Sequence, residues 1–220
     1  MSTKPKYLAS FARRVARTLG ETQKKFLKEH LPLIQIDLEG DFSSLRNGYA
    51  AVELEVGSGN GEFIIQLAQA NPNKLYIACE PFINGVASLL KLIHENKVTN
   101  IRIFVDDARL LLSKMPDVYL EQIYVICPDP WPKRKQQKRR LINEEFLKLL
   151  HQKTQQGLLV VTDHKDYAAW ILNQLQASNF RIVGKVLNDF TTLPKDWLFT
   201  KYQRFGIDQG SKIYYFNCLK

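Results

Sequence analysis

The fold is indicated by residues 51–70, AVELEVGSGNGEFIIQLAQA. Residues 51–56 are a short apolar run that ends in glycines, and the apolar side chains of residues 62–70 recur at helical spacing. Glycines between a strand and a helix permit a tight turn and a close approach of the backbone to a ligand. The stretch therefore predicts a strand, a ligand-binding turn and a helix.

The rest of the chain repeats this alternation. Short apolar or β-branched runs predict strands at 75–79, 101–105, 122–127, 158–162 and 211–218. Helical spacing predicts helices at 86–93, 143–150 and 167–175. Strands that alternate with helices of this length indicate an α/β, Rossmann-like fold with a mostly parallel central sheet and helices on both faces. Such sheets bind ligands at the carboxyl ends of their strands.

Two regions are predicted along the chain. Residues 1–35 form a basic N-terminal segment, helical or partly flexible, in which Pro32 interrupts any helix. Residues 36–220 form one domain of a size normal for an α/β unit. The net charge of +9 favours a polyanionic partner, because each neutralised phosphate releases condensed counterions. A soluble basic protein without such a partner could carry the same net charge, so only the positions of the charged residues can distinguish the two interpretations.

The three cysteines Cys79, Cys127 and Cys218 form no Cys-x-x-Cys pair and no cysteine–histidine cluster with zinc spacing. We therefore expect no metal site, and unpaired thiols fit a reducing cytoplasm. We also expect no secretory signal and no membrane span, because the apolar runs are too short. The expected location is the cytoplasm, and a monomer and a homodimer are both compatible with the sequence.

The glycine turn has the pattern G-x-G-x-G, formed by Gly57, Gly59 and Gly61 and preceded by Glu55. A dinucleotide fingerprint would have glycine where Glu62 stands, which argues against NAD. The pattern resembles the first motif of class I methyltransferases, whose cofactor, S-adenosylmethionine, has no pyrophosphate. The resemblance implies that the three glycines approach this cofactor and that Glu55 holds its methionine ammonium, directly or through water.

Acidic residues also end the next two predicted strands. Glu80 lies about 20 positions past the glycine turn, where a carboxylate can accept hydrogen bonds from ribose hydroxyls. Asp106 and Asp107 end the third strand, where a carboxylate can accept from the adenine amino group. A surface glutamate and aspartates that cap a helix are the simpler interpretations. Acidic groups at three successive strand ends favour cofactor binding.

A proline-rich loop, PDPWPK at residues 128–133, follows the fourth predicted strand. Three prolines in five residues fix φ and predict a rigid loop, suited to holding a planar base beside the methyl donor. A basic run follows directly, which predicts phosphate contacts by Arg134, Lys138, Arg139 and Arg140. The alternative is a solvated charged turn, but so dense a cluster repels itself without a counter-charge.

A second basic group lies near the N-terminus, in residues 10–17, SFARRVAR. We expect its arginines, Arg13, Arg14 and Arg17, to contact RNA phosphates as well.

The P-D-P-W-x-K run followed by K-R-R-L resembles the signature of the bacterial tRNA (guanine-N7-)-methyltransferases. The resemblance covers most of the chain. The patterns S-F-x-R-R-x-x-R and E-V-G-S-G-N-G, the pair Thr162-Asp163, and a late T-x-Y with a following glycine occur in the order of that family.

This resemblance implies an S-adenosylmethionine-dependent enzyme that methylates N7 of a guanosine in the tRNA variable loop, guanosine-46. It places the cofactor on Glu55, Glu80, Asp107 and Asp129, with Asp129 as the catalytic residue. It places the substrate on Lys133, Asp163, Thr200, Lys201, Tyr202 and Gln203. Position 203 departs from the family pattern T-x-Y-E. Without the resemblance, Asp163 would be read as the N-cap of a helix near Lys165, and Thr200 and Tyr202 as strand-edge residues.

Guanine N7 carries an in-plane lone pair and no proton, so it can attack a sulfonium methyl group without a general base. Positioning can supply several kcal/mol, and a carboxylate stabilises the cationic product ring. We therefore assign Asp129 to orientation and electrostatics. Two alternatives stay open: a methyltransferase acting on an exocyclic amine of a nucleic acid, and a non-catalytic RNA-binding module on the same fold.

Overall fold

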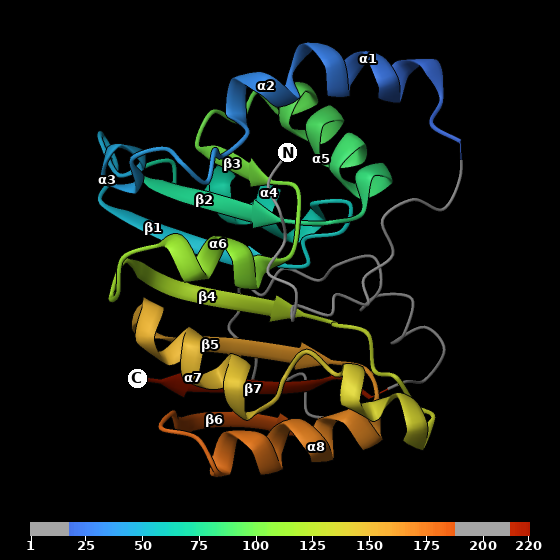
Figure 1. The fold of residues 1–220 in the computed structure, drawn as a ribbon, viewed down its shortest axis with the longest axis vertical. Helices are drawn as coiled ribbons and strands as arrows, with labels where there is room; N and C mark the ends of the chain where they lie inside the picture. The colour runs from blue at the N-terminus through green and yellow to red at the C-terminus, as the bar shows by residue number, and fades with distance from the viewer. Residues whose placement is uncertain (1–17, 188–211) are drawn as a thin grey trace.

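The computed structural model describes residues 18–187 and 212–220. Within these residues it contains a seven-stranded sheet with the order β3-β2-β1-β4-β5-β7-β6 (Figure 1). The strands β1 to β5 are parallel, and β7 runs antiparallel between β5 and β6. The strands are β1 (Ala51–Val56), β2 (Lys74–Cys79), β3 (Ile101–Phe104), β4 (Leu120–Ile126), β5 (Thr154–Thr162), β6 (Arg181–Leu187) and β7 (Tyr214–Leu219).

Helices cover both faces of the sheet (Figure 1). The face that carries the largest core packs against α6, α7 and α8, and the other face packs against α4 and α5. The helices are α1 (Glu21–Glu29), α2 (Leu31–Ile34), α3 (Phe42–Leu45), α4 (Glu62–Ala70), α5 (Ile83–Glu95), α6 (Ala108–Lys114), α7 (Glu144–Lys153) and α8 (Lys165–Gln176). This architecture confirms the predicted Rossmann-like α/β fold.

Strand β1 is buried on both faces, and this explains where its two glutamates lie. Val52, Leu54 and Val56 join the core beneath α6, α7 and α8. Because side chains alternate along a strand, Glu53 and Glu55 point to the opposite face. Both are buried, so each carboxyl group needs a polar or charged partner there.

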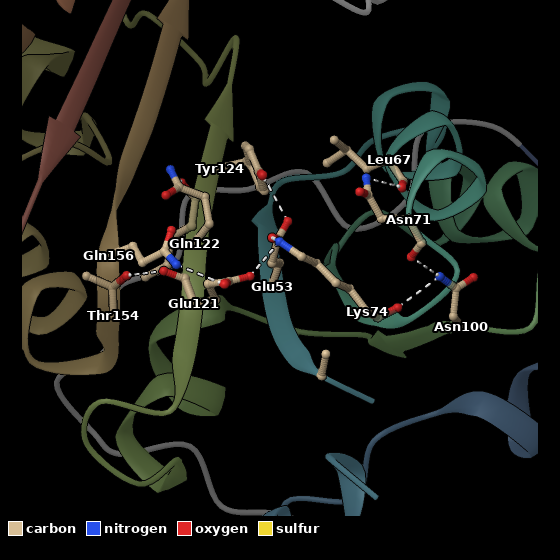
Figure 2. A network of polar contacts seen from close by, with 12 residues as sticks. Glu53, Leu67, Asn71, Lys74, Asn100, Glu121, Gln122, Tyr124, Thr154 and Gln156 are labelled. Atoms are coloured by element: carbon tan, nitrogen blue, oxygen red, sulfur yellow. Dashed lines mark hydrogen bonds and ion pairs between the residues drawn. The ribbon is translucent and has the colours of Figure 1, made fainter. Parts of the chain in front are cut away.

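Glu53 has its partners within the protein, as Figure 2 shows. Its carboxylate lies 2.7 Å from the Lys74 ammonium and accepts a 2.9 Å hydrogen bond from the Tyr124 hydroxyl. Lys74 also pairs with Glu121 at 2.5 Å. Lys74 begins β2 and Glu121 lies near the start of β4, so this network lies toward the amino ends of the strands.

Several elements differ from the sequence-based expectation, and the short helix α3 has no counterpart in it. The sequence pattern does not predict strand β6, because Gly184 interrupts its apolar run at a register shift on the sheet edge. For the short helix α6 the sequence offers only Asp106 and Asp107 as possible caps. Pro32 lies in the first turn of α2, where its missing N–H is tolerated, and α1 has already ended at Glu29.

The N-terminal helices α1 and α2 pack on the sheet domain. Phe26, Leu27, Leu31 and Ile34 lie against the core that α5 forms with β2 and β3. In the part of the chain that the structure describes, no helix is both long and apolar enough to cross a membrane.

Candidate active site

The glycine turn after β1 has the backbone geometry that its sequence predicts. Gly57, Gly59 and Gly61 have φ angles of 77°, 54° and 85°, in the left-handed region that favours glycine. A Cβ atom on Gly61 would also lie 2.3 Å from Cδ1 of Leu89 in α5. A side chain at this position is therefore excluded by strain and by packing.

Two residues tie this turn to the neighbouring strand and helix. Glu80, which follows β2, accepts hydrogen bonds from the backbone N–H of Gly59 at 2.7 Å and of Phe82 at 2.8 Å. Gly85 in α5 lies so close that a Cβ atom there would be 2.6 Å from the Gly59 carbonyl oxygen. Sequence reasoning missed Gly85, although a glycine directly before the helix predicted at 86–93 is a usable signal of close approach.

Glu55 is the buried acid without a full set of partners. Its Oε2 atom and the Ser58 hydroxyl have no hydrogen-bond partner among the described residues. Burial raises the pKa of Glu55 to about 8, the charge of Glu80 adds to the rise, and the backbone N–H of Ile64 lowers it. A buried carboxyl group with an open oxygen, beside a glycine turn, fits the methionine ammonium of S-adenosylmethionine.

Asp107 has the helix-capping role that was the simpler interpretation of its sequence position. It is the N-cap of α6, and its carboxylate accepts from the Arg109 backbone N–H at 3.0 Å. The Arg109 guanidinium also donates to both carboxylate oxygens, at 2.9 and 2.7 Å. Arg109 thus orients the acid at the end of β3, a partner that sequence reasoning did not identify.

The proline-rich loop follows β4 at the same edge of the sheet. Asp129 is exposed there. Burial raises the pKa of Glu80, hydrogen bonds from Phe82 and Gly59 lower it, and the charge of Asp129 raises it further. Burial raises the pKa of Tyr167 in α8 to about 12, and the charge of Asp129 contributes to the rise. Asp129 therefore lies within electrostatic range of both Glu80 and Tyr167.

The basic run forms a 3-10 helix, Arg134–Arg139. Lys133, Arg134 and Lys138 are exposed, and Arg139 lies with its guanidinium 4.9 Å from the ring centroid of Trp131. These residues are accessible to a nucleic acid.

Arg140 does not fit the expectation of a phosphate contact. Its side chain is 1% exposed, and its guanidinium pairs with Asp166 and donates to the Pro130 carbonyl. A cation that is buried and hydrogen-bonded within the protein cannot reach RNA, so Arg140 is removed from the predicted phosphate contacts.

Asp163 is exposed just after β5, close to the loop. Burial raises the pKa of Cys127 to about 12, and the charge of Asp163 contributes to the rise. The alternative reading of Asp163 as an N-cap is wrong. The N-cap of α8 is His164, whose Nδ1 accepts from the Tyr167 backbone N–H at 3.3 Å.

The remaining predicted contacts lie outside the described residues: Arg13, Arg14, Arg17, Thr200, Lys201, Tyr202 and Gln203. Residues 18–187 and 212–220 contain no group of three or more histidine, cysteine or acidic side chains that could hold a metal ion.

The fold is shared with solved methyltransferase structures. The 16S rRNA methyltransferase KamB superposes with a TM-score of 0.61 and 15% sequence identity, over 82% of this chain and 93% of KamB. An antibiotic-related methyltransferase superposes with a TM-score of 0.60 and 16% identity, over 84% of this chain and 94% of that protein. At this identity the similarity establishes the class I methyltransferase fold.

Sequence comparison is more specific. A family model described as "Putative methyltransferase" matches residues 49–216. The tRNA (guanine-N(7)-)-methyltransferase of Hyphomonas neptunium is 38% identical over 203 residues, 89% of this chain and 92% of that protein. The tRNA (guanine-N(7)-)-methyltransferase of Caulobacter vibrioides is 36% identical, over 94% of this chain and 93% of that protein. The chain therefore belongs to the tRNA (guanine-N7-)-methyltransferase family of class I S-adenosylmethionine-dependent methyltransferases.

Proposed function

We propose that this protein methylates N7 of a guanosine in tRNA, and that the target is guanosine-46 of the variable loop. The proposal is supported above all by the position of Glu55, Glu80 and Asp129, which all lie at the carboxyl-end edge of the sheet. Glu80 lies within electrostatic range both of Glu55, a buried acid with an open oxygen, and of Asp129, an exposed acid on the proline-rich loop. A cationic cofactor and a planar base can therefore be held next to each other at this edge.

Three acids would hold S-adenosylmethionine. Glu55 would accept from its ammonium, Glu80 from its ribose hydroxyls and Asp107 from its adenine amino group. Glu80 keeps acceptor capacity for this role, because each of its oxygens is engaged by one backbone N–H. When bound, the cofactor supplies an electrophilic sulfonium methyl group.

The protein has no proton to remove from the nucleophile, since guanine N7 carries none. Asp129 would therefore orient the base and stabilise the positive charge that develops on its ring. Lys133, exposed at the end of the loop, would contact the guanine O6 or a neighbouring phosphate. Asp163 would lie on the other side of the same pocket, with Thr200, Lys201, Tyr202 and Gln203 as further substrate contacts.

Cations around the loop would bind the tRNA backbone. Arg134, Lys138 and Arg139 would contact phosphates from the loop side, and the N-terminal arginines Arg13, Arg14 and Arg17 would add a second set of contacts.

The test is incubation with isotopically labelled S-adenosylmethionine and an unmodified tRNA transcript, followed by nucleoside analysis. The expected product is N7-methylguanosine, and a transcript with adenosine at position 46 should not be labelled. Label on an exocyclic amine, or none at all, would contradict the proposal.

Asp129→Asn tests the role of the charge separately from that of shape. We expect S-adenosylmethionine affinity within a few-fold of the unsubstituted protein and a single-turnover rate lower by at least about tenfold, or 1.4 kcal/mol. An unchanged rate would make Asp129 structural.

A further inference from the structure

Two neighbouring arginines of the basic run lie in opposite environments. Arg139 is half-buried against Trp131, whereas Arg140 is one of the few buried charged residues described, with 2% of its surface exposed. Burying a cation is unfavourable unless it is paired and hydrogen-bonded. The groups that pair with Arg140 therefore indicate which part of the structure the buried guanidinium stabilises.

The Arg140 guanidinium connects the proline-rich loop to α8. Its Nε donates to the Pro130 carbonyl oxygen at 2.9 Å, and its terminal nitrogen pairs with the Asp166 carboxylate. The guanidinium carbon lies 5.0 Å from the Tyr167 ring centroid and 5.2 Å from that of Trp170. We call these four side chains, Arg140, Asp166, Tyr167 and Trp170, the loop clamp.

The loop clamp also holds the backbone just after Arg140. The Ile142 N–H donates to the Tyr167 hydroxyl at 3.1 Å, and the Trp170 indole N–H donates to the Ile142 carbonyl at 2.7 Å. Both backbone polar groups of this buried residue are thus paired with α8. The returning end of the loop has a fixed position, from which Arg140 reaches back to its start.

We propose that the loop clamp is a positioning device for Asp129, and that Arg140 is its central residue. The proposal rests on the proposed function, since it assigns a task to a loop that holds the substrate base. Pro130, the acceptor of the Arg140 hydrogen bond, is bonded directly to Asp129. Fixing that carbonyl fixes the Pro130–Trp131 peptide plane, and the proline ring restricts φ of Pro130, the residue that joins this plane to Asp129.

Arginine suits this task better than lysine. A planar guanidinium can donate to a carbonyl and a carboxylate at once while its faces contact aromatic rings. A lysine at the same place would keep the positive charge, but its ammonium could not donate from a planar group to two acceptors while stacking on the aromatic rings. A misplacement of about 1 Å in a catalytic group can lower the rate by about a hundredfold.

The test compares Arg140→Lys with Lys153→Gln. Lys153 is also a buried cation that donates to a backbone carbonyl, of Met115 at 2.7 Å, and pairs with a carboxylate, of Asp117 at 2.6 Å. It ends α7, next to the start of β5, at the edge of the sheet away from the loop. It therefore controls for the destabilisation that follows when the contacts of a buried cation are disrupted, without any change to the loop.

Three quantities are measured for each variant: the dissociation constants for S-adenosylmethionine and for a tRNA transcript, and the single-turnover methylation rate with both saturating. For Arg140→Lys we expect a rate lower by at least about tenfold and both dissociation constants within about threefold. For Lys153→Gln we expect a lower melting temperature and an unchanged rate.

Trp170→Phe is the second variant if Arg140→Lys does not fold. It removes the indole donor to Ile142 and keeps an aromatic ring beside Arg140, so a partial loss of rate is expected. An unchanged rate in the clamp variants, or an equal loss in Lys153→Gln, would overturn the positioning role. Failure of the unsubstituted protein to form N7-methylguanosine in the same assay would instead contradict the proposed function.

Discussion

Glu55→Gln should abolish the proton release that accompanies S-adenosylmethionine binding. Glu55 is buried beneath the glycine turn, and burial, followed by the charge of Glu80, raises its pKa to about 8. The carboxyl group is therefore mostly protonated at pH 7 in the unliganded protein. It has to be ionised to hold an ammonium group, so binding and proton release are coupled.

The expected magnitude follows from the pKa. A value one unit above pH 7 means that about nine in ten chains carry the proton, so roughly 0.9 protons should leave for each cofactor bound. Ionising the group at pH 7 costs about 1.4 kcal/mol, a tenfold loss of affinity relative to a Glu55 that was ionised beforehand. Glu55→Gln has nothing to release, and it also loses a charge-assisted hydrogen bond worth about 1.5–3 kcal/mol.

The assay is titration calorimetry at pH 7 in two buffers that differ in ionisation enthalpy. The difference between the apparent enthalpies gives the number of protons exchanged, and any uptake by the cofactor's own amino group is common to both proteins. Equal proton exchange in the unsubstituted protein and in Glu55→Gln would refute the assignment of Glu55 to the ammonium.

Four further outcomes are expected. The unliganded protein should lose stability as pH rises from about 5 to 8, because the folded chain keeps a Glu55 proton that the unfolded chain loses. Thermal melts should show a smaller loss of stability over this range in Glu55→Gln. Identical pH profiles for the two proteins would contradict this. In calorimetry, Gly85→Ala should weaken S-adenosylmethionine binding by about tenfold or more, because its Cβ would lie 2.6 Å from the Gly59 carbonyl oxygen. Gly184→Ala is the control and should bind the cofactor normally, because the nearest atom to its Cβ would be 3.7 Å away. Replacing Arg134, Lys138 and Arg139 by glutamine should lower the slope of log tRNA affinity against log salt by roughly 0.7–0.9 per lost phosphate contact, and an unchanged slope would make them a solvated face. In steady-state kinetics, Asp163→Asn should lower kcat/KM at least about tenfold while Gln203→Glu leaves it nearly unchanged, and the reverse pattern would make Gln203 the guanine contact.

Much of the fold and part of the site could be predicted from local patterns. The alternation of apolar runs with helical spacing predicted the parallel strands, because burial on both faces requires continuous apolar runs. It also predicted α4, α5, α7 and α8, four of the eight α-helices in the described residues. It failed at β6, where Gly184 breaks the pattern on an edge strand. The sequence alone predicts that the acids at 55, 80 and 129 lie at one edge of the sheet, since the carboxyl ends of parallel strands meet there.

The sequence by itself therefore determined the class of fold, the glycine turn and the edge where the chemistry takes place. Only the tertiary structure decided how individual side chains share that edge. Arg139 and Arg140 are indistinguishable as letters in a basic run, yet only Arg140 is enclosed by α8, a helix about 26 residues further along the chain. Glu53 and Glu55 lie two residues apart in one strand, yet the Lys74 ammonium pairs with Glu53 and leaves Glu55 with an open oxygen. Burial and pairing arise from contacts between residues that are distant in sequence, and a local sequence pattern does not predict such contacts.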